Sequence, residues 1–517
     1  MPSYRGVSKM HKLIIDGESL VITDVAMVAR ENYFVELAEE AKAKIQKSRD
    51  YVDKLVDSNA VVYGITTGFG KFSEVNISKE DTKALQRNLI ISHSCNLGDP
   101  LAEEVVRGII LIRCNALAKG FSGIRLSTVQ TLLDMLNKGV HPVVPEKGSL
   151  GASGDLSPLA HIVLVLLGEG EAFYKGIRMT GKEAMDKAGI KTVELISKEG
   201  LALINGTPIM GAIGALAVYD ANNLMKTADI IGAMTLEALR GITDAFDSKV
   251  HIARGQKGQM ISGRNILRIV EGSKLTTKQG EIRVQDAYSL RCIPQIHGAT
   301  RDAIKYVDDI ISIELNAATD NPLIFVDEDQ VISGGNFHGQ PLAIALDTLG
   351  IALSELANVS ERRTERLVNP QLNDLPAFLT KKGGLNSGFM IVQYSAASIV
   401  SENKILAHPA SVDSIPSSAN QEDHVSMGTT SARKARVILD NVQKVLGIEA
   451  FAGSQAIYLR GEVVLGKGTN KVYELIRKEV TPVTDDRIMY IEIVKFDNMI
   501  KRNAFVEATE AAVGKLE

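Results

Sequence analysis

The stretch "TPIMGAIGALAVYDANNLMKTADIIGAMTLEALRG", residues 207–241, decides the fold class of this chain. Thr207 is a helix cap and Pro208 suits the first helical position, and no further proline occurs before Gly241. Charged residues scattered through the stretch exclude a membrane-spanning helix; they are Asp220, Lys226 and Asp229. Because its apolar surface is broad, such a helix must pack against other helices.

Further long helices are predicted elsewhere in the chain. One opens at Pro341 and must end before Pro370, and another runs from Thr429 to about Leu446. Shorter helices are predicted over 31–56, 103–117 and 127–139, the last with Ser127 as N-cap and Gly139 as the stop. The fold is therefore expected to be mainly α, a bundle of long antiparallel helices with a looped N-terminal domain.

The pattern divides the chain into three expected domains. Residues 1–206 carry the glycine-rich segments, 207–460 form the central long-helix bundle, and 461–517 form a more charged helical tail. Two strand-like stretches, "KLIIDGESLVI" at 12–22 and "LIFVDEDQVI" at 323–332, are predicted to be local hairpins.

Composition excludes several classes of protein. The 517 residues include 58 Lys and Arg against 62 Asp and Glu, with no basic run of the kind that binds nucleic acid. Apolar runs such as "IVLVLL" from Ile162 are too short to span a bilayer, and a signal-peptide core is not expected, so the predicted location is the cytoplasm. The cysteines are too far apart for a zinc ribbon or a disulfide framework; they are Cys95, Cys114 and Cys292.

The segment "GSLGASGDLSPLAH", residues 148–161, has three small residues before a helix start at Ser157. One interpretation is a tight turn, and a phosphate-binding loop is disfavoured because no Lys-Ser/Thr pair follows the glycines. A third interpretation is backbone cyclisation, in which the Gly154 nitrogen attacks the carbonyl of Ala152. Loss of two waters, one of them from the Ser153 hydroxyl, would then leave an exocyclic methylidene electrophile.

The same segment resembles the signature of the aromatic amino-acid ammonia-lyases. Other segments similar to that family follow in order over about residues 12–510; they are "VYGITTGFG" (62–70), "LQRNLIISHSCNLGDPL" (85–101), "LINGTP" (203–208), "VQDAYSLRC" (284–292), "GGNFHGQP" (334–341) and "NQEDHVSM" (420–427). The resemblance implies a fumarase/aspartase-like helical core, α,β-elimination of ammonia, and homotetramers whose active sites are shared between subunits. It also implies a 4-methylideneimidazole-5-one formed from Ala152, Ser153 and Gly154, without metal or diffusible cofactor.

The resemblance also assigns residues to the elimination. Tyr63 matches the family's catalytic base, and Tyr288 and Gln285 match residues that hydrogen-bond the electrophile and the substrate. A phenol normally titrates near ~10, so a base at Tyr63 requires nearby positive potential. The helix starts at Ser157 and Thr207 are expected to face one cavity and to supply that potential.

Three more residues match substrate contacts of the family. Arg291 matches the guanidinium that binds the substrate carboxylate, a task suited to its planar fork of donors. Asn205 matches an amide that contacts the electrophile or the substrate amine. Phe337 matches an aromatic residue beside the electrophile, although simple core packing accounts for it equally well.

The choice of amino acid is indicated by two segments. Histidine-specific members resemble Ser92-His93, and His93 can hydrogen-bond an imidazole nitrogen. They also resemble "QEDHVSM", in which Glu422 can accept from an imidazole N–H. Thr66 departs from the "VYGINTGFG" of those members. L-Histidine is therefore the expected substrate and trans-urocanate the product, in the first step of histidine degradation.

Three alternatives remain open from the sequence. One is a lyase for phenylalanine or tyrosine, or a 2,3-aminomutase of the same family. Another is a helical scaffold without activity. A metal site at "EDH" together with His338 and His424 is disfavoured, because the histidines lack the spacing of metal-binding motifs.

Overall fold

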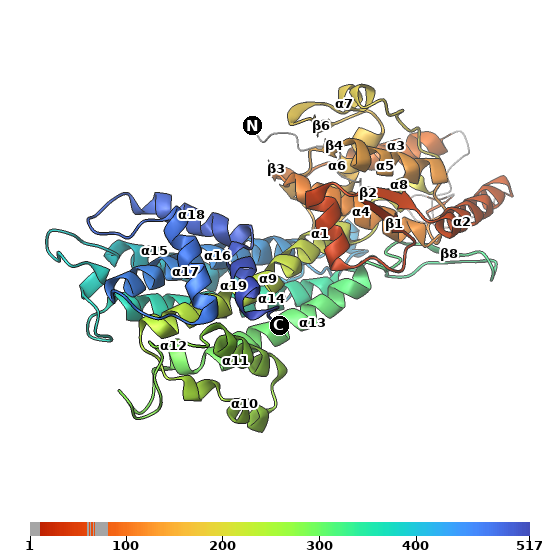
Figure 1. Cartoon of the computed structure of the whole chain (residues 1–517). Helices are drawn as coiled ribbons and strands as arrows, with labels where there is room; N and C mark the ends of the chain where they lie inside the picture. Colours follow the sequence, from red (N-terminus) through yellow and green to blue (C-terminus); the bar gives the residue numbers. More distant parts are fainter. Residues whose placement is uncertain (1–10, 59–61, 63, 66, 68–80) are drawn as a thin grey trace. The chain divides into compact units, whose positions relative to one another are not determined.

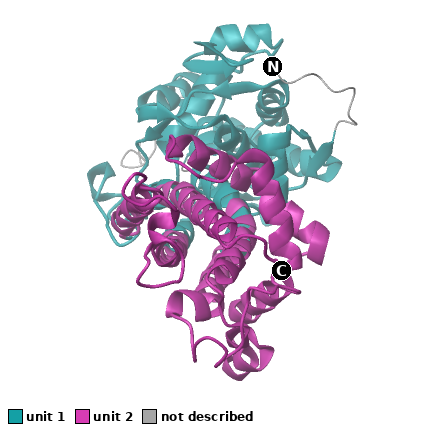
Figure 2. Ribbon diagram, turned by 60° about the vertical axis from the view of Figure 1, so that its left-hand side comes forward, with its two compact units in different colours: residues 1–219, 308–347, 409–433 teal, residues 220–307, 348–408, 434–517 magenta. Residues whose placement is uncertain are grey.

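The computed structural model describes residues 11–58, 62, 64–65, 67 and 81–517. They form two compact units, each built from three chain segments (Figure 2). Unit 1 contains residues 1–219, 308–347 and 409–433, and unit 2 contains 220–307, 348–408 and 434–517. The division at 206 and 460 expected from the sequence follows the chain and stays a prediction.

Unit 1 consists of helices with small sheets at their ends. Its helices before residue 207 are α1 Ile22–Glu31, α2 Glu39–Asp57, α3 Thr82–His93, α4 Glu103–Ala118, α5 Leu126–Lys138, α6 Leu156–Leu166, α7 Gly181–Lys187 and α8 Glu199–Ile204. The short helix η4 Ser418–Asn420 also belongs to this unit. The paired strands are β1 Lys12–Ile15 with β2 Phe34–Leu37, β3 Leu97–Pro100 with β5 Pro145–Lys147, β4 Val140–Pro142 with β6 Glu171–Tyr174 and β7 Ile177–Thr180, and β8 Leu323–Phe325 with β9 Gln330–Ile332.

Four long helices run through residues of both units and are drawn in Figure 1. They are α9 Pro208–Ala238, α13 Ile293–Glu314, α14 Gln340–Val368 and α16 Gly428–Leu459. Unit 2 adds η2 Thr243–Phe246, α10 Ser248–Arg254, α11 Lys257–Ile269, α12 Tyr288–Arg291, η3 Ala377–Leu379, α15 Met390–Leu406, α17 Lys467–Glu479, α18 Met489–Lys501 and α19 Ala504–Val513. The mainly helical class predicted from the sequence is confirmed.

The long helices do not all alternate in direction. Within unit 2, α9 meets α16 at Asp220–Arg436 and again at Thr235–Glu449, so these two helices run parallel. Helix α13 runs antiparallel to α9, because Asp229 meets His297 while Gly232 lies against the earlier residue Ile293. Two parallel helices of one chain need an antiparallel segment between them in the sequence. Helix α13 is the segment that runs back along α9.

Buried charges join these helices in unit 2. Arg363 of α14 donates to both carboxylate oxygens of Glu449 in α16, at 2.6 and 2.9 Å, and both side chains are fully buried. Asp229 of α9 accepts from Arg301 at 2.6 Å and lies 2.8 Å from the His297 ring nitrogen Nδ1. A series of aromatic rings in T-shaped and tilted contacts completes the core of this unit; it comprises Phe389, Phe451, Phe496 and Phe505.

Helix α14 is the described helix that is long and apolar enough to cross a membrane by length and composition. Of its apolar window, 61% is buried inside the structure. It also carries Arg363, whose charge is paired with Glu449 in the core of unit 2. These features are those of a core helix.

Three local predictions met different outcomes. The helix expected over 31–56 is interrupted, because Phe34–Leu37 forms strand β2, which pairs in parallel with β1. The hairpin expected at 12–22 is therefore wrong, since its first strand pairs with a segment beyond helix α1. The hairpin at 323–332 is confirmed as β8 and β9.

For helix α5, the predicted start was wrong and the predicted end was correct. It begins at Leu126 with Arg125 in the N-cap position, so the prediction of Ser127 as N-cap is wrong. Gly139 does end the helix, with a left-handed φ of +73° that favours glycine.

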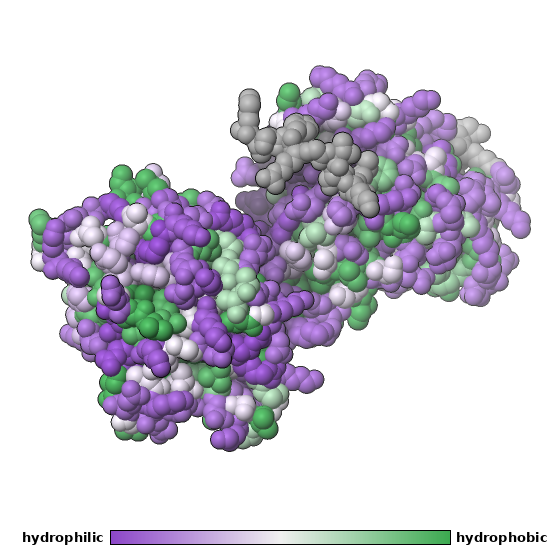
Figure 3. All heavy atoms as spheres, viewed as in Figure 1, coloured by the Kyte–Doolittle hydropathy of each residue, from purple (hydrophilic) through white to green (hydrophobic). Residues whose placement is uncertain are grey.

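Apolar side chains also reach the surface between polar ones, as the space-filling view shows (Figure 3). In unit 2, three side chains of α15 are more than half exposed: Ile391 (56%), Tyr394 (56%) and Ile405 (74%). Only three of the 17 residues of α15 are buried. A helix with so little of its apolar surface covered is typical of chains that associate.

Candidate active site

The starts of helices α6 and α9 meet at one buried carboxylate in unit 1. Asp155, the residue before α6, accepts from the backbone N–H groups of Ile209 and Met210 at 3.0 and 3.1 Å. It also accepts from the hydroxyls of Thr429 and Ser149, at 2.5 and 3.2 Å. Burial nevertheless raises the pKa of Asp155 to about 6, against the lowering effect of these hydrogen bonds.

The Ala152-Ser153-Gly154 tripeptide forms a compressed turn directly before Asp155. Gly151 and Gly154 pair across the turn, and Gly154 has a φ of +70°. A Cβ atom at Gly154 would lie 2.1 Å from the carbonyl oxygen of Gly206, so the position admits only glycine. Gly151 is confined in the same way, since its Cβ would lie 2.3 Å from Ser426 Oγ. A tripeptide held this tightly fits the precursor of a cyclised group.

Asn205 lies against this turn at the end of helix α8. Its Nδ2 donates to the carbonyl oxygen of Ser153 at 3.1 Å. Its Oδ1 is buried and has no hydrogen-bond partner among the described residues. A buried acceptor without a partner is costly, so this atom is placed to accept from a bound ligand.

Glu422 reaches the tripeptide from a segment that we call the Glu422 segment, residues 414–427. The hydroxyl of Ser153 donates to Glu422 Oε1 at 2.9 Å. The end of the segment is fixed to the same turn, because the Ser426 hydroxyl donates to the Gly151 carbonyl at 3.1 Å and the Met427 N–H donates to the Leu150 carbonyl at 2.9 Å. The carboxylate is thus anchored beside the side chain that cyclisation would consume.

His93 ends helix α3 on the same side as Glu422. Burial lowers the pKa of His93, while the Leu89 carbonyl and the Glu422 carboxylate act in the opposite direction. The hydroxyl of Ser92 lies 3.1 Å from His93 Nδ1. The structure therefore brings Asn205 and Glu422 to Ser153 and places His93 within electrostatic reach of Glu422.

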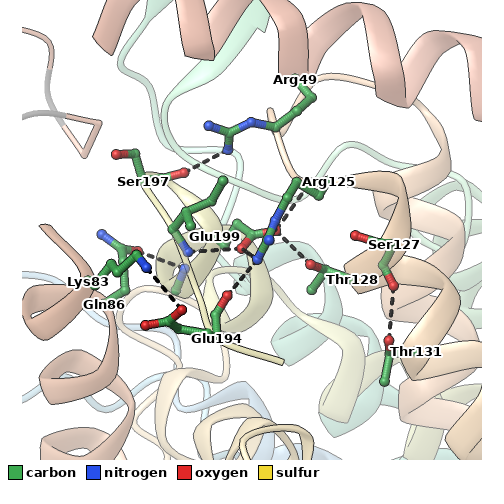
Figure 4. A network of polar contacts seen from close by, with 12 residues as sticks. Arg49, Lys83, Gln86, Arg125, Ser127, Thr128, Thr131, Glu194, Ser197 and Glu199 are labelled. Atoms are coloured by element: carbon green, nitrogen blue, oxygen red, sulfur yellow. Dashed lines mark hydrogen bonds and ion pairs between the residues drawn. The ribbon is translucent and has the colours of Figure 1, made fainter. Parts of the chain in front are cut away.

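A buried polar network fixes the helices that carry Asn205 and His93 (Figure 4). Glu199, at the start of α8 and fully buried, accepts from Arg125 Nη2 at 2.5 Å and from the Thr128 hydroxyl at 2.7 Å. Gln86 of α3 accepts from the Gly200 N–H of α8 at 2.8 Å. These bonds join α3 to α8 and so constrain the separation of the two site residues.

Phe337 lies half buried in the turn between β9 and α14. The nearby Gly339 would place a Cβ 3.1 Å from Ser426 Oγ, so this turn lies next to the Glu422 segment. His338 Nε2 lies 3.3 Å from the His424 carbonyl, and the two imidazole rings stack with centroids 6.0 Å apart. Among the residues that the structure describes, His, Cys, Asp and Glu form no group of three suited to a metal ion.

The remaining predicted residues lie outside the described residues or in unit 2. Tyr63 and Thr66 lie outside the described residues. Gln285, Tyr288 and Arg291 belong to unit 2, where the Arg291 guanidinium lies 4.6 Å from the centroid of the Tyr288 ring. Arg291 Nε is buried without a hydrogen-bond partner among the described residues, and Tyr288 is 69% exposed.

Sequence reasoning did not identify the hydroxyl and carboxyl groups that support the turn. Asp155 directly follows the tripeptide in "GASGD", and this position in the sequence could have indicated that it supports the turn. Thr429 and Ser149 contact Asp155 across 274 and 6 residues of chain. A contact across 274 residues leaves no local pattern.

Comparison with known proteins identifies the family of this chain. The family model for aromatic amino acid lyases matches residues 20–478. A histidine ammonia-lyase of Alkaliphilus oremlandii is 64% identical over 98% of this chain and 99% of its own length. The crystal structure of histidine ammonia-lyase from Trypanosoma cruzi matches with a TM-score of 0.91 and 42% identity, over 97% of this chain and 96% of that one. A tyrosine aminomutase from Streptomyces globisporus matches with a TM-score of 0.94 and 38% identity, over 98% and 100% of the two chains.

The helical fold and these relatives define an enzyme of the carbon–nitrogen lyase class. The chain belongs to the aromatic amino acid lyase family. Members of this family use a self-formed methylidene-imidazolone group as their electrophile.

Proposed function

We propose that this protein is a histidine ammonia-lyase that eliminates ammonia from L-histidine to give trans-urocanate. The observation that carries the proposal is the hydrogen bond from the Ser153 hydroxyl to Glu422, a carboxylate close enough to His93 to act on its pKa. An imidazole ring offers an N–H donor and a nitrogen acceptor, and these two side chains supply the matching groups. A phenyl ring would offer no donor to Glu422 Oε1.

The electrophile is proposed to form from Ala152, Ser153 and Gly154, without metal or diffusible cofactor. The group supplies a strong electrophile that activates the substrate for elimination. Asn205 Nδ2 already donates to the Ser153 carbonyl, which becomes the carbonyl of the ring, so it stabilises negative charge on that oxygen. The backbone of Gly206 lies against Gly154 and accepts from the Asp155 N–H, and these contacts hold the turn in place.

The other roles belong to side chains that bind substrate and move the proton. Glu422 and His93 orient the imidazole, and Asn205 Oδ1 accepts from the substrate amine. Tyr63 is assigned as the base that removes the β-proton. Phe337 packs beside the reacting group. Each assignment follows the family resemblance, and the geometry around Ser153 supports those of Glu422, His93 and Asn205.

Gln285, Tyr288 and Arg291 are proposed to act in the active site of a neighbouring subunit. Their support is the buried but unpartnered Arg291 Nε and the exposed Tyr288, which are suited to a carboxylate and a hydrogen-bonding partner. The exposed apolar residues of α15 favour assembly, proposed to be a homotetramer. The enzyme is proposed to work in the cytoplasm.

Two measurements on the purified protein test this function. Incubation with L-histidine should produce urocanate absorbance, whereas L-phenylalanine and L-tyrosine should give no cinnamate or coumarate. Intact mass should fall below the calculated mass by about two waters. Ser153→Ala should lack the dehydration that consumes the Ser153 hydroxyl and should lower activity about a thousandfold or more. A β-amino acid product would identify an aminomutase, and absence of turnover with all three amino acids would refute the proposal.

A further inference from the structure

Glu422 is held by a second residue of its own segment, Ser417. The Ser417 hydroxyl donates to Glu422 Oε2 at 2.8 Å. Their backbones also pair, with the Ser417 N–H donating to the Glu422 carbonyl at 2.9 Å and the Glu422 N–H donating to the Ser417 carbonyl at 3.3 Å. The carboxylate and the hydroxyl therefore close one small loop.

The loop between them has an uncommon backbone. Ser418, Ala419 and Asn420 have φ values of +51°, +53° and +65°, in the left-handed region that residues with side chains seldom adopt. Three such residues in succession turn the chain sharply, so that Ser417 and Glu422 come opposite each other. The turn thus brings the hydroxyl to the carboxylate.

We infer that Ser417 is a positioning residue that fixes the Glu422 carboxylate for recognition of the substrate imidazole, an inference that rests on the proposed function. With Oε2 occupied by the Ser417 hydroxyl, Oε1 is the oxygen that faces Ser153 at 2.9 Å. A hydrogen bond to a charged oxygen is stronger than a neutral one, so it restricts the rotation of the glutamate side chain.

This arrangement favours substrates whose ring carries an N–H donor. A fixed carboxylate oxygen presents one defined acceptor to an imidazole N–H, and His93 lies close to that carboxylate. An amino acid whose ring has no N–H cannot donate to this oxygen, so positioning the carboxylate does not strengthen its binding. Ser417 accordingly acts on the binding of histidine, while formation of the electrophile does not require it.

The matched pair of variants is Ser417→Ala and Ser418→Ala. Ser418 is the same residue type, lies in the same loop and is exposed. We expect Ser417→Ala to raise the KM for L-histidine about tenfold with a smaller change in kcat, because an unpositioned carboxylate weakens binding. Ser417→Thr retains a hydroxyl and should restore the KM, and all three variants should show the same loss of two waters by intact mass.

A double-mutant cycle then tests whether Ser417 acts through Glu422. In a Glu422→Gln background, Ser417→Ala should change kcat/KM by less than about twofold, since the charged acceptor is gone. The inference is overturned if Ser417→Ala behaves like Ser418→Ala, if Ser417→Thr fails to restore the KM, or if the full effect persists in Glu422→Gln. A wild-type protein that makes no urocanate overturns the proposed function and this inference together, which distinguishes that failure from the others.

Discussion

Buried carboxylates in the two units accept hydrogen bonds from different kinds of donor. In unit 2, the carboxylates of Asp229 and Glu449 are each matched by a guanidinium and by additional donors. In unit 1, the carboxyl of Asp155 accepts only from backbone N–H groups and hydroxyls, and the nearby Asn205 Oδ1 has no hydrogen-bond partner among the described residues. A carboxylate matched by a cation stabilises one arrangement of helices, whereas an acceptor without a partner is available to a ligand.

The pKa directions express the same difference. Although burial acts to raise the pKa of Asp229, Arg301, His297 and Asn265 together hold it below its ordinary value. Asp155 is equally buried and accepts only from neutral donors, and its pKa rises to about 6. A neighbouring cation therefore decides which buried carboxyl remains charged.

The largest expected effect on stability is that of Glu449→Ala in unit 2. It leaves Arg363 buried without its partner, which should lower the free energy of unfolding by about 3–5 kcal/mol. Urea denaturation monitored by circular dichroism measures the change. Glu474→Ala, which removes an exposed pair with Lys471, is the control. A loss below about 1 kcal/mol for Glu449→Ala would show that the network is not a main source of stability.

Asn205→Ala should instead affect catalysis. It removes the donor to the Ser153 carbonyl and should lower kcat/KM for histidine about a hundredfold, or about 2.7 kcal/mol, with little change in the urea midpoint. Steady-state kinetics and denaturation are measured on the same preparation. Asn498→Ala, at an exposed position, serves as the control. Equal losses of stability and activity would contradict the distinction between the two units.

Asp155→Asn tests the buried carboxyl through the pH dependence of stability. Because the folded-state pKa is raised from 3.8 to about 6, the folded protein binds this proton more tightly than the unfolded chain. The contribution of Asp155 is thus complete below about pH 4 and is lost as the pH rises through about 6, amounting to about 3 kcal/mol. The variant should show a flatter dependence of the urea midpoint over this range. An unchanged slope would refute the assignment.

The smallest expected effect is that of Lys83→Ala. Lys83 and Glu194 form an ion pair with side chains 58% and 72% exposed, near the network around Glu199. Solvent screens such a pair, so stability should change by less than about 0.5 kcal/mol and kcat/KM should remain within about twofold. Denaturation and kinetics at two salt concentrations measure both. A loss above about 1 kcal/mol would mean that the surface of the network matters as much as its buried part.

The sequence predicted the elements whose signals are local. Pro208 and the absence of a later proline set the limits of α9, and Gly139 ended α5 with the left-handed φ that glycine permits. The prediction over 31–56 held for α2 but was wrong for residues 34–37. Val35 and Leu37 are two residues apart, as the buried face of a strand requires, and the partner strand β1 decided for the strand. Where the pattern of a segment fits both a helix and a strand, the elements that pack against the segment decide which one forms.

The residues of the candidate site were likewise predicted only in part. Ser153, His93, Asn205 and Glu422 were named from motifs, because their chemistry requires those residue types. Asp155, Thr429 and Ser417 were not, since a hydroxyl or carboxyl that supports another group has no motif of its own. Their contacts join the loops into one site.

By itself, the sequence determined a mainly helical lyase whose tripeptide is small enough to be compressed. These properties follow from residue size, helix propensity and the positions of proline and glycine, which act over a few residues. Only the tertiary structure decided that α9 and α16 run parallel while α13 returns, that Asp155 ties two helix starts together, and that Ser417 holds Glu422. Such contacts depend on how buried charges and hydroxyls find partners far along the chain, which no local pattern records.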